Sequence, residues 1–224
     1  MATSIARRDV AAERWFWPLW LGAFGLAVLL TLAARARPHF PGDVHAALAL
    51  QALEWPGEDA IVRAENVLGS GLVPAVIMLL ATLAFLVARR FVACLAFLIS
   101  SAMWSLNTVL KDLAQRPRPT ASLIEVNEHA TGYSFPSGHA LGSLVFFGTL
   151  AALVAARIRS TAARALVWIV AILLVAAIGF SRIYLGVHYP TDVIGGYAAA
   201  LVWVIAVALG DHARQRHVER YKER

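Results

Sequence analysis

Residues 165–210 read ALVWIVAILLVAAIGFSRIYLGVHYPTDVIGGYAAALVWVIAVALG, and this stretch decides the fold class. It holds two apolar segments without Asp, Glu, Lys or Arg, Ala165–Ser181 and Val193–Gly210, joined by a short polar connection. A helix needs roughly 20 mainly apolar residues to cross the hydrocarbon core of a bilayer, and fewer where its buried ends carry function. The stretch therefore predicts two membrane-spanning helices joined by a tight turn.

Four similar apolar segments precede this pair along the chain. They are Trp15–Ala34, Val67–Ala88, Phe91–Leu110 and Ala140–Ala156. With 59% hydrophobic and only 15% charged residues, the chain has too little polar surface to enclose a soluble globule of its size. Neither an internal repeat nor a linker rich in Ser and Gly divides it. We therefore expect an all-α fold, a six-transmembrane-helix bundle, in a single domain over residues 1–224.

The distribution of charge predicts the orientation of this bundle. Most of the 20 Lys and Arg residues lie in the two terminal segments and in the connections after the second and fourth apolar segments. Most of the 14 acidic residues lie in the other connections. Lys and Arg are enriched in cytoplasmic connections. Both termini are therefore expected to be cytoplasmic, with residues 35–66, 111–138 and 182–190 on the outer side.

The segment Gly42–Asn66, between the first two expected crossings, is too polar to span a bilayer. Its apolar residues recur at near-helical spacing until Trp55 and Pro56 interrupt the pattern. This pattern predicts an amphipathic helix that lies in the outer membrane interface. Two roles stay open for it, because such a helix can help to admit a lipid or can simply cap the bundle.

Several classes of partner and cofactor are not expected. The net charge of +6 could indicate a nucleic-acid partner, but Lys and Arg form short clusters between apolar segments rather than a continuous patch. Cys94 is the only cysteine, which excludes an intrachain disulfide and a cysteine-based metal cluster. Glu125, Glu128 and His129 could hold a cation, although a solvated loop is the preferred interpretation. We expect no cofactor and no metal, and predict no oligomeric state.

Polar residues converge on the outer face of the expected bundle. With the amino terminus inside, the third crossing ends and the fourth begins on the outer side, and the fifth and sixth meet there as well. Ionisable residues at such depths are costly, so they indicate function. Because successive crossings run in opposite directions, the order of the helices alone brings cations, histidines and a carboxylate to one surface. These residues are Lys111, Arg118, Arg182, His139, His188 and Asp192.

These residue types suit the binding and transfer of an oxyanion. Lys and Arg supply positive charge, and the guanidinium fork of arginine matches phosphate oxygens. Residues 136–138, Pro-Ser-Gly, lead into a helix whose amino-terminal N–H groups favour an anion. Asp192 lies four residues after His188, so its carboxylate could hold one ring nitrogen while the other attacks phosphorus. His139 could protonate the leaving oxygen.

Taken singly, these features have simpler explanations, such as a snorkelling lysine, a surface helix pair or a helix cap. Together they form three motifs, and through them the chain resembles the type 2 phosphatidic acid phosphatase superfamily, which includes lipid phosphate phosphatases and vanadium haloperoxidases. The resemblance covers residues 111–192 directly. The motif residues are Lys111, Arg118 and Pro119; Pro136, Ser137, Gly138 and His139; and Ser181, Arg182, His188 and Asp192.

The resemblance implies a role for each of these positions. It makes His188 the nucleophile that forms a phosphohistidine, Asp192 the residue that orients it, and His139 the acid that then activates water. It implies no metal. It implies hydrolysis of a lipid phosphate or diphosphate, of the undecaprenyl diphosphate, phosphatidylglycerophosphate or phosphatidate type, at the outer face of a bacterial inner membrane. The implied phosphate ligands are Lys111, Arg118, Ser137, Gly138 and Arg182.

Other functions stay open at this point. A phosphohistidine can pass its phosphoryl group to another lipid or sugar instead of to water, which would make the protein a lipid phosphotransferase. A lipid transporter or lipid-binding protein would also place charges between helices, but it would not need His139, His188 and Asp192. Haloperoxidase activity is not expected, because the relatives that bind vanadate in this way are soluble. The sequence does not identify the lipid or its headgroup.

Overall fold

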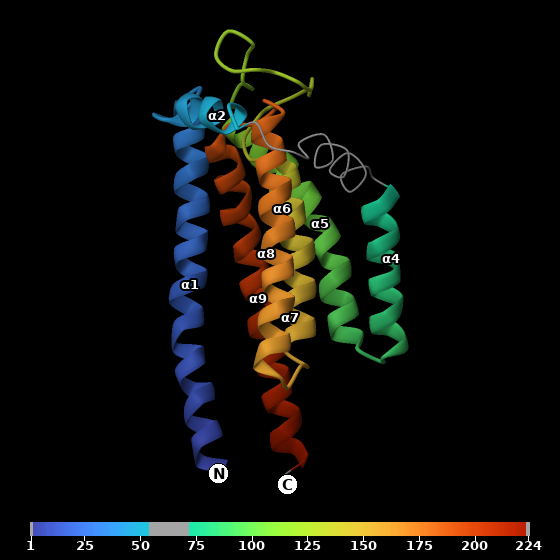
Figure 1. Cartoon of the computed structure of the whole chain (residues 1–224). Coiled ribbons are helices and arrows are strands. Elements are labelled where there is room, and N and C mark those ends of the chain that lie inside the picture. The colour runs from blue at the N-terminus through green and yellow to red at the C-terminus, as the bar shows by residue number, and fades with distance from the viewer. Residues whose placement is uncertain (1, 54–71, 223–224) are drawn as a thin grey trace.

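The computed structural model describes residues 2–53 and 72–222, and within these ranges every regular element is helical. Figure 1 shows the long helices running side by side, with the short helix α2 across one end of the bundle. The three segments α6, η1 and α7 follow one another directly as a single rod. The helices are α1 (Ala2–Ala36), α2 (Asp43–Gln51), α4 (Leu72–Val87), α5 (Phe91–Ala114), α6 (Gly138–Ser143), η1 (Leu144–Gly148), α7 (Thr149–Ala155), α8 (Thr161–Tyr184) and α9 (Pro190–Lys222).

Five of these helical stretches are long and apolar enough to cross a membrane. They are Phe16–Ala36, Ala93–Ala114, Gly138–Ala155, Thr161–Tyr184 and Pro190–Arg216. The apolar helix Val76–Val87, within α4, is shorter. The predicted all-α membrane fold is thus confirmed, whereas the sixth crossing, the orientation and the interfacial, amphipathic character of residues 42–66 stay predictions. The expected segment Val67–Ala88 begins outside the described residues.

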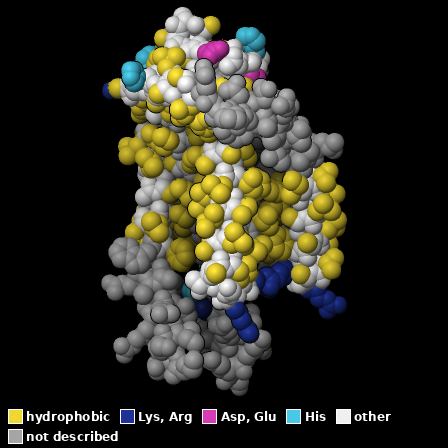
Figure 2. All heavy atoms as spheres, viewed as in Figure 1, with side chains coloured by type: hydrophobic (Ala, Val, Ile, Leu, Met, Phe, Trp, Pro, Cys, Tyr) yellow, Lys and Arg dark blue, Asp and Glu magenta, His cyan; other side chains and the backbone are white. Residues whose placement is uncertain are grey.

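The surface of the bundle has the polarity expected of a membrane protein. Figure 2 shows a broad apolar band over the helices, with Lys and Arg below it and mainly His, Asp and Glu above it. Many large apolar side chains of the helices are exposed, among them Leu80 of α4 at 60% and Leu173 of α8 at 63%. Such a band cannot be left in water without a large free-energy cost, so it faces lipid.

Helix α9 is the central element of the packing, because it contacts α1, α6, η1, α7 and α8. Buried small residues, Ala198 to Ala200, let neighbouring helices approach it closely. The crossing with α8 is tight: a Cβ atom at Gly179 would lie 2.0 Å from the Tyr197 hydroxyl oxygen. Toward the carboxyl end of α9, Arg157 binds both carboxylate oxygens of Asp211, at 2.6 and 2.7 Å.

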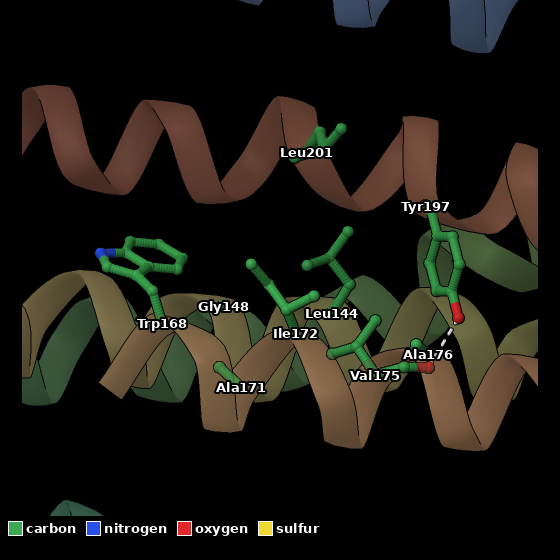
Figure 3. A pocket seen from close by; sticks show the side chains of 9 residues that line it. All are labelled: Leu144, Gly148, Trp168, Ala171, Ile172, Val175, Ala176, Tyr197 and Leu201. Atoms are coloured by element: carbon green, nitrogen blue, oxygen red, sulfur yellow. Dashed lines mark hydrogen bonds between the residues drawn. The ribbon is translucent and has the colours of Figure 1, made fainter. Parts of the chain in front are cut away.

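An apolar cavity of about 280 Å³ lies beside the crossing of α8 and α9. It lies between α8, α9 and the segment that includes η1 (Figure 3). Tyr197 lies at the end of the cavity nearer to the start of α9, where its hydroxyl donates a hydrogen bond of 2.6 Å to the Val175 carbonyl. The π-helical turn η1 therefore borders this space with Leu144 and Gly148, while its buried residue Val145 packs against α9.

Local backbone features send the chain into the connections that carry the predicted site. Helix α5 ends where Gln115 adopts a left-handed conformation with φ of 51°, and its N–H bonds the Lys111 carbonyl at 2.8 Å. Helix α6 begins after Ser137, whose hydroxyl accepts a hydrogen bond from the Ala140 N–H. Since both ends lie at one end of the bundle, the residues that follow α5 and precede α6 meet there.

Candidate active site

All of the predicted site residues lie at the end of the bundle that α2 crosses. Lys111 is in the last turn of α5, Arg182 is in the last turn of α8, and Asp192 is in the first turn of α9. His139 belongs to the first turn of α6. Lys111 and Arg118 both lie close enough to the two imidazoles, His139 and His188, to act on them electrostatically. The expected convergence of motifs is therefore present in the structure.

His188 lies between a carboxylate and a cation. Its Nδ1 atom is 3.5 Å from Asp192 Oδ2, and its Nε2 atom is 3.5 Å from Arg118 Nη1. The side chain is buried, and this burial lowers the pKa of His188 to about 4, against the opposing effect of Asp192 and with a further lowering by Arg118. The ring is therefore neutral at pH 7. With its proton on Nδ1, facing the carboxylate, Nε2 carries the lone pair.

The Asp192 carboxylate is fully buried and held from several directions. Its Oδ2 atom accepts hydrogen bonds from the Tyr189 N–H at 2.8 Å and from the Ser134 hydroxyl. Its Oδ1 atom accepts a hydrogen bond of 2.6 Å from Arg116 Nη1. A buried carboxylate with this many donors keeps one orientation and stays ionised. Asp192 therefore presents a fixed negative charge to His188.

Lys111 and Arg118 are both held by backbone carbonyls, most of them in the chain segment that precedes α6. Lys111 Nζ donates to the Tyr133 carbonyl at 2.6 Å and to the Ser134 carbonyl at 3.3 Å. Arg118 donates to backbone carbonyls as well: Nε to Gly132 at 3.1 Å, Nη2 to Thr131 at 3.1 Å and Nη1 to Val187 at 2.8 Å. Neutral carbonyls fix these side chains without cancelling their charge. Both cations consequently stay available to an anion.

Arg182 has a different partner. Its side chain is buried, and its Nη1 atom lies 3.3 Å from Glu128 Oε1 in the connection before α6. Its backbone carbonyl accepts hydrogen bonds from the N–H groups of Val187 and His188, at 3.2 and 3.3 Å. The backbone of the nucleophile candidate is thus tied to the end of α8. Glu128 is half-buried, so an incoming anion would compete with it for Arg182.

The start of α6 is closely packed. Ser137 and Gly138 are both buried, and the Ser137 N–H donates to the Asp192 backbone carbonyl at 3.0 Å. The Ser137 hydroxyl caps the helix, as the sequence allowed, and can still donate its own proton to an anion because a hydroxyl both accepts and donates. A Cβ atom at residue 138 would lie 2.9 Å from the amide nitrogen of Asn107. A side chain at residue 138 would therefore displace the Asn107 amide.

The structure also shows participants that the sequence did not single out. Arg116 lies within the first motif but outside its defining positions, and it binds Asp192 directly. Ser134 and Asn107 likewise lie beside motif residues. The available signal in the sequence was a second Arg-Pro pair, Arg116 and Pro117, directly before Arg118 and Pro119. By contrast, Glu125, Glu128 and His129 do not gather, since the described residues hold no group of three or more His, Cys, Asp or Glu side chains suited to a metal ion.

The fold and the site residues define the class. The protein is an integral membrane helical protein with a cationic cluster, which comprises Lys111, Arg118 and Arg182, and a buried pair, His188 and Asp192, at one end of its helices. Residues 90–216 match the model of the PAP2 superfamily. Over 80% of the chain and 96% of the relative, the sequence is 31% identical to decaprenylphosphoryl-5-phosphoribose phosphatase of Mycobacterium tuberculosis. The chain belongs to the PAP2 superfamily.

Two further comparisons involve Bacillus subtilis. The chain is 35% identical to phosphatidylglycerophosphatase B over 43% of its own length, and the match spans only about half, 47%, of that relative. The fold resembles the crystal structure of a transmembrane PAP2-type phosphatidylglycerolphosphate phosphatase, with a TM-score of 0.73 and 24% sequence identity, over 86% of this chain and 95% of that one. This likeness supports the fold, and the family assignment confirms the resemblance seen in the motifs.

Proposed function

We propose that the protein is an integral membrane phosphatase that hydrolyses a lipid phosphate or diphosphate through a phosphohistidine. One observation carries this proposal: a buried, neutral His188 has Asp192 at one ring nitrogen and Arg118 at the other. A nucleophile needs a free lone pair, and its attack on an anion needs nearby positive charge. At Nε2 the lone pair faces Arg118, whose Nη1 atom lies 3.5 Å away. An incoming phosphate would draw this cation to its own oxygens and leave the lone pair free to attack.

In the first step, Lys111, Arg118, Arg182 and the start of α6 would bind the phosphate oxygens. His188 Nε2 attacks phosphorus, and the bond between phosphorus and the leaving oxygen breaks. His139, which comes from a separate helix, gives its proton to that oxygen. The imidazole gains positive charge as the N–P bond forms, and Asp192 beside Nδ1 stabilises it.

In the second step, His139 acts as a base. It takes a proton from water, whose oxygen attacks the phosphohistidine, and the N–P bond breaks to release phosphate. His188 returns to its neutral form and His139 to its protonated form, so the cycle is balanced without a further reactant. The cationic cluster supplies the charge stabilisation in both steps, and the mechanism that we propose uses no metal ion. Interception by an alcohol instead of water would give a phosphotransferase, which product analysis distinguishes.

We propose a lipid that ends in a phosphate or diphosphate as the substrate. The two relatives described above are named as a phosphatidylglycerophosphatase and a decaprenylphosphoryl-5-phosphoribose phosphatase, and a relative in Sulfolobus acidocaldarius is named as an undecaprenyl-diphosphatase. The test is phosphate release by the purified protein in detergent from a panel of lipid phosphates and diphosphates, with His188→Ala as the control. A hundredfold preference, about 2.7 kcal/mol in transition-state binding, would identify the substrate. Release by His188→Ala at the same rate would reject the proposal.

We further propose six crossings, cytoplasmic termini and a site on the outer face of a bacterial inner membrane. In support, α1 begins and α9 ends at the same end of the bundle, opposite α2, and α4 runs beside α5 (Figure 1). Single cysteines at Glu128 and Arg159, introduced with Cys94→Ala, test this with an impermeant label. Labelling at 128 but not at 159 in intact cells is expected, and the reverse pattern would invert the topology.

A further inference from the structure

A fully buried arginine beside the site takes no part in the steps above. Arg116 is 0% exposed, and its guanidinium lies between two carboxylates, with Nη1 2.6 Å from Asp192 Oδ1 and Nη2 2.5 Å from Asp43 Oδ2. The rings of Phe40 and Tyr189 lie 5.0 and 4.7 Å from its central carbon. A buried charge is costly unless it is paired in good geometry. Arg116 meets this condition on each side.

Asp43 completes this arrangement from the first turn of α2. Its Oδ1 atom accepts a hydrogen bond of 3.1 Å from the Thr191 N–H, and its Oδ2 atom accepts one of 2.7 Å from the Thr191 hydroxyl. That hydroxyl in turn accepts a hydrogen bond of 2.8 Å from Arg116 Nη1. Asp43 is therefore bound both to Arg116 and to the residue that directly precedes Asp192. Helix α2 is thus connected to the first turn of α9 by buried polar contacts.

The consequence for the nucleophile follows from the two oxygens of Asp192. Arg116 holds Oδ1, so Oδ2 is the atom that faces His188 Nδ1, at 3.5 Å. Oδ2 is also held by the Tyr189 N–H and the Ser134 hydroxyl. If Arg116 moved or lost its second partner, Oδ1 would lose this donor, and the carboxylate could rotate about Oδ2 and change the direction in which Oδ2 faces the imidazole. Catalytic hydrogen bonds tolerate little misplacement, and a shift of about 1 Å can cost roughly 100-fold in rate.

We propose that Arg116 and Asp43 are positioning residues for the reaction: they hold the Asp192 carboxylate so that it fixes the ring orientation and the tautomer of His188. This inference rests on the proposed function. Neither residue touches the phosphate in this arrangement. Their loss should therefore lower kcat and leave KM largely unchanged, because substrate binding depends on Lys111, Arg118 and Arg182.

The alternative is that these contacts only attach α2 to the bundle. A control is available at the other end of α9, where Asp211 pairs with Arg157 of the connection after α7, at 2.6 Å. Asp211 lies 19 residues after Asp192 along α9, about 28 Å away at 1.5 Å per residue. Asp211→Asn removes the same kind of charge as Asp43→Asn but has no connection to His188. Any general effect of removing a carboxylate that pairs with an arginine should appear in both variants.

The experiment uses the full chain in detergent, the best lipid phosphate of the panel and three variants. We expect Asp43→Asn to lower kcat roughly 10- to 100-fold, the range typical of residues that orient a functional side chain from outside, with KM within about twofold. Asp211→Asn should keep kcat within about twofold. In the double variant Asp43→Leu with Arg116→Met both charges disappear together, so the fold is retained more easily, yet kcat should fall as in Asp43→Asn.

A spectroscopic measurement separates positioning from attachment. The ¹⁵N resonances of His188 in the free protein, identified by their loss in His188→Ala, should show a single tautomer with its proton on Nδ1. In Asp43→Asn and in the double variant we expect a mixture of tautomers, whereas Asp211→Asn should match the wild type. Full kcat in the double variant, or a loss confined to KM, would overturn the inference. Equal turnover by the wild type and His188→Ala would instead reject the proposed function itself.

Discussion

The titration of His188 is the prediction that can be worked furthest from the structure. Burial lowers the pKa of His188 to about 4, compared with 6.5 for an ordinary histidine. At pH 5.5 a group with a pKa of about 4 is about 97% neutral, whereas one with a pKa of about 6.5 is about 9% neutral. A buried nucleophile should therefore keep almost all of its reactive form at a pH where an exposed histidine has lost it.

The assay is a ¹⁵N titration of the histidine-labelled protein in detergent between pH 3.5 and 8, with the signal of residue 188 identified by its absence in His188→Gln. We expect no change of charge at residue 188 above about pH 5. The folded pKa lies below the unfolded one, so the unfolded chain takes up the proton first and stability falls as the pH drops from about 6.5 to 4. The full effect is about 3 kcal/mol, and the unfolding midpoint of His188→Gln should lack it. A titration midpoint of 6 or above would refute the reasoning.

Three further predictions follow. His139→Ala should lose more activity on a lipid monophosphate than on an aryl phosphate, since a good leaving group needs less protonation; equal losses would exclude an acid role. Turnover should survive EDTA and be inhibited by orthovanadate, which resembles the transition state, and Arg182→Ala should weaken that inhibition; activity that needs added Mg²⁺ would contradict this. Gly179→Ala should lower the unfolding midpoint, by about 1 to 3 kcal/mol in free energy, because its Cβ would lie 2.0 Å from the Tyr197 hydroxyl; Tyr197→Phe in the same chain should restore part of the loss.

The helical architecture was predictable because it depends on local composition. The expected segment Ala165–Ser181 corresponds to α8, Thr161–Tyr184, and the expected Phe91–Leu110 corresponds to α5, which continues to Ala114. The extension has a physical reason. Lys111 can stay helical at the membrane edge because its ammonium binds two backbone carbonyls. A search for uncharged segments ends a helix at such a residue.

The positions of the motif residues were predictable, but their contacts were not. Parity of the helices brings His139 and His188 to one end without any knowledge of packing. The contact of Arg116 with Asp43 joins residues 73 positions apart, and that with Asp192 joins residues 76 positions apart. Such pairings depend on how the connections fold over the bundle, which no periodicity records. The charged residues at this end of the bundle were therefore predictable, but not the partner of each.

The central claim is that His188 becomes phosphorylated during turnover, and rapid acid-free quenching of a reaction with a ³²P-labelled substrate tests it most directly. His139→Ala with an aryl phosphate is the best form of the protein, because its first step should proceed while the second, which needs a base to activate water, is slow. We predict an acid-labile, alkali-stable label that peptide mapping assigns to His188. A label on another residue, or turnover with an active-site burst in His188→Ala, would contradict the account.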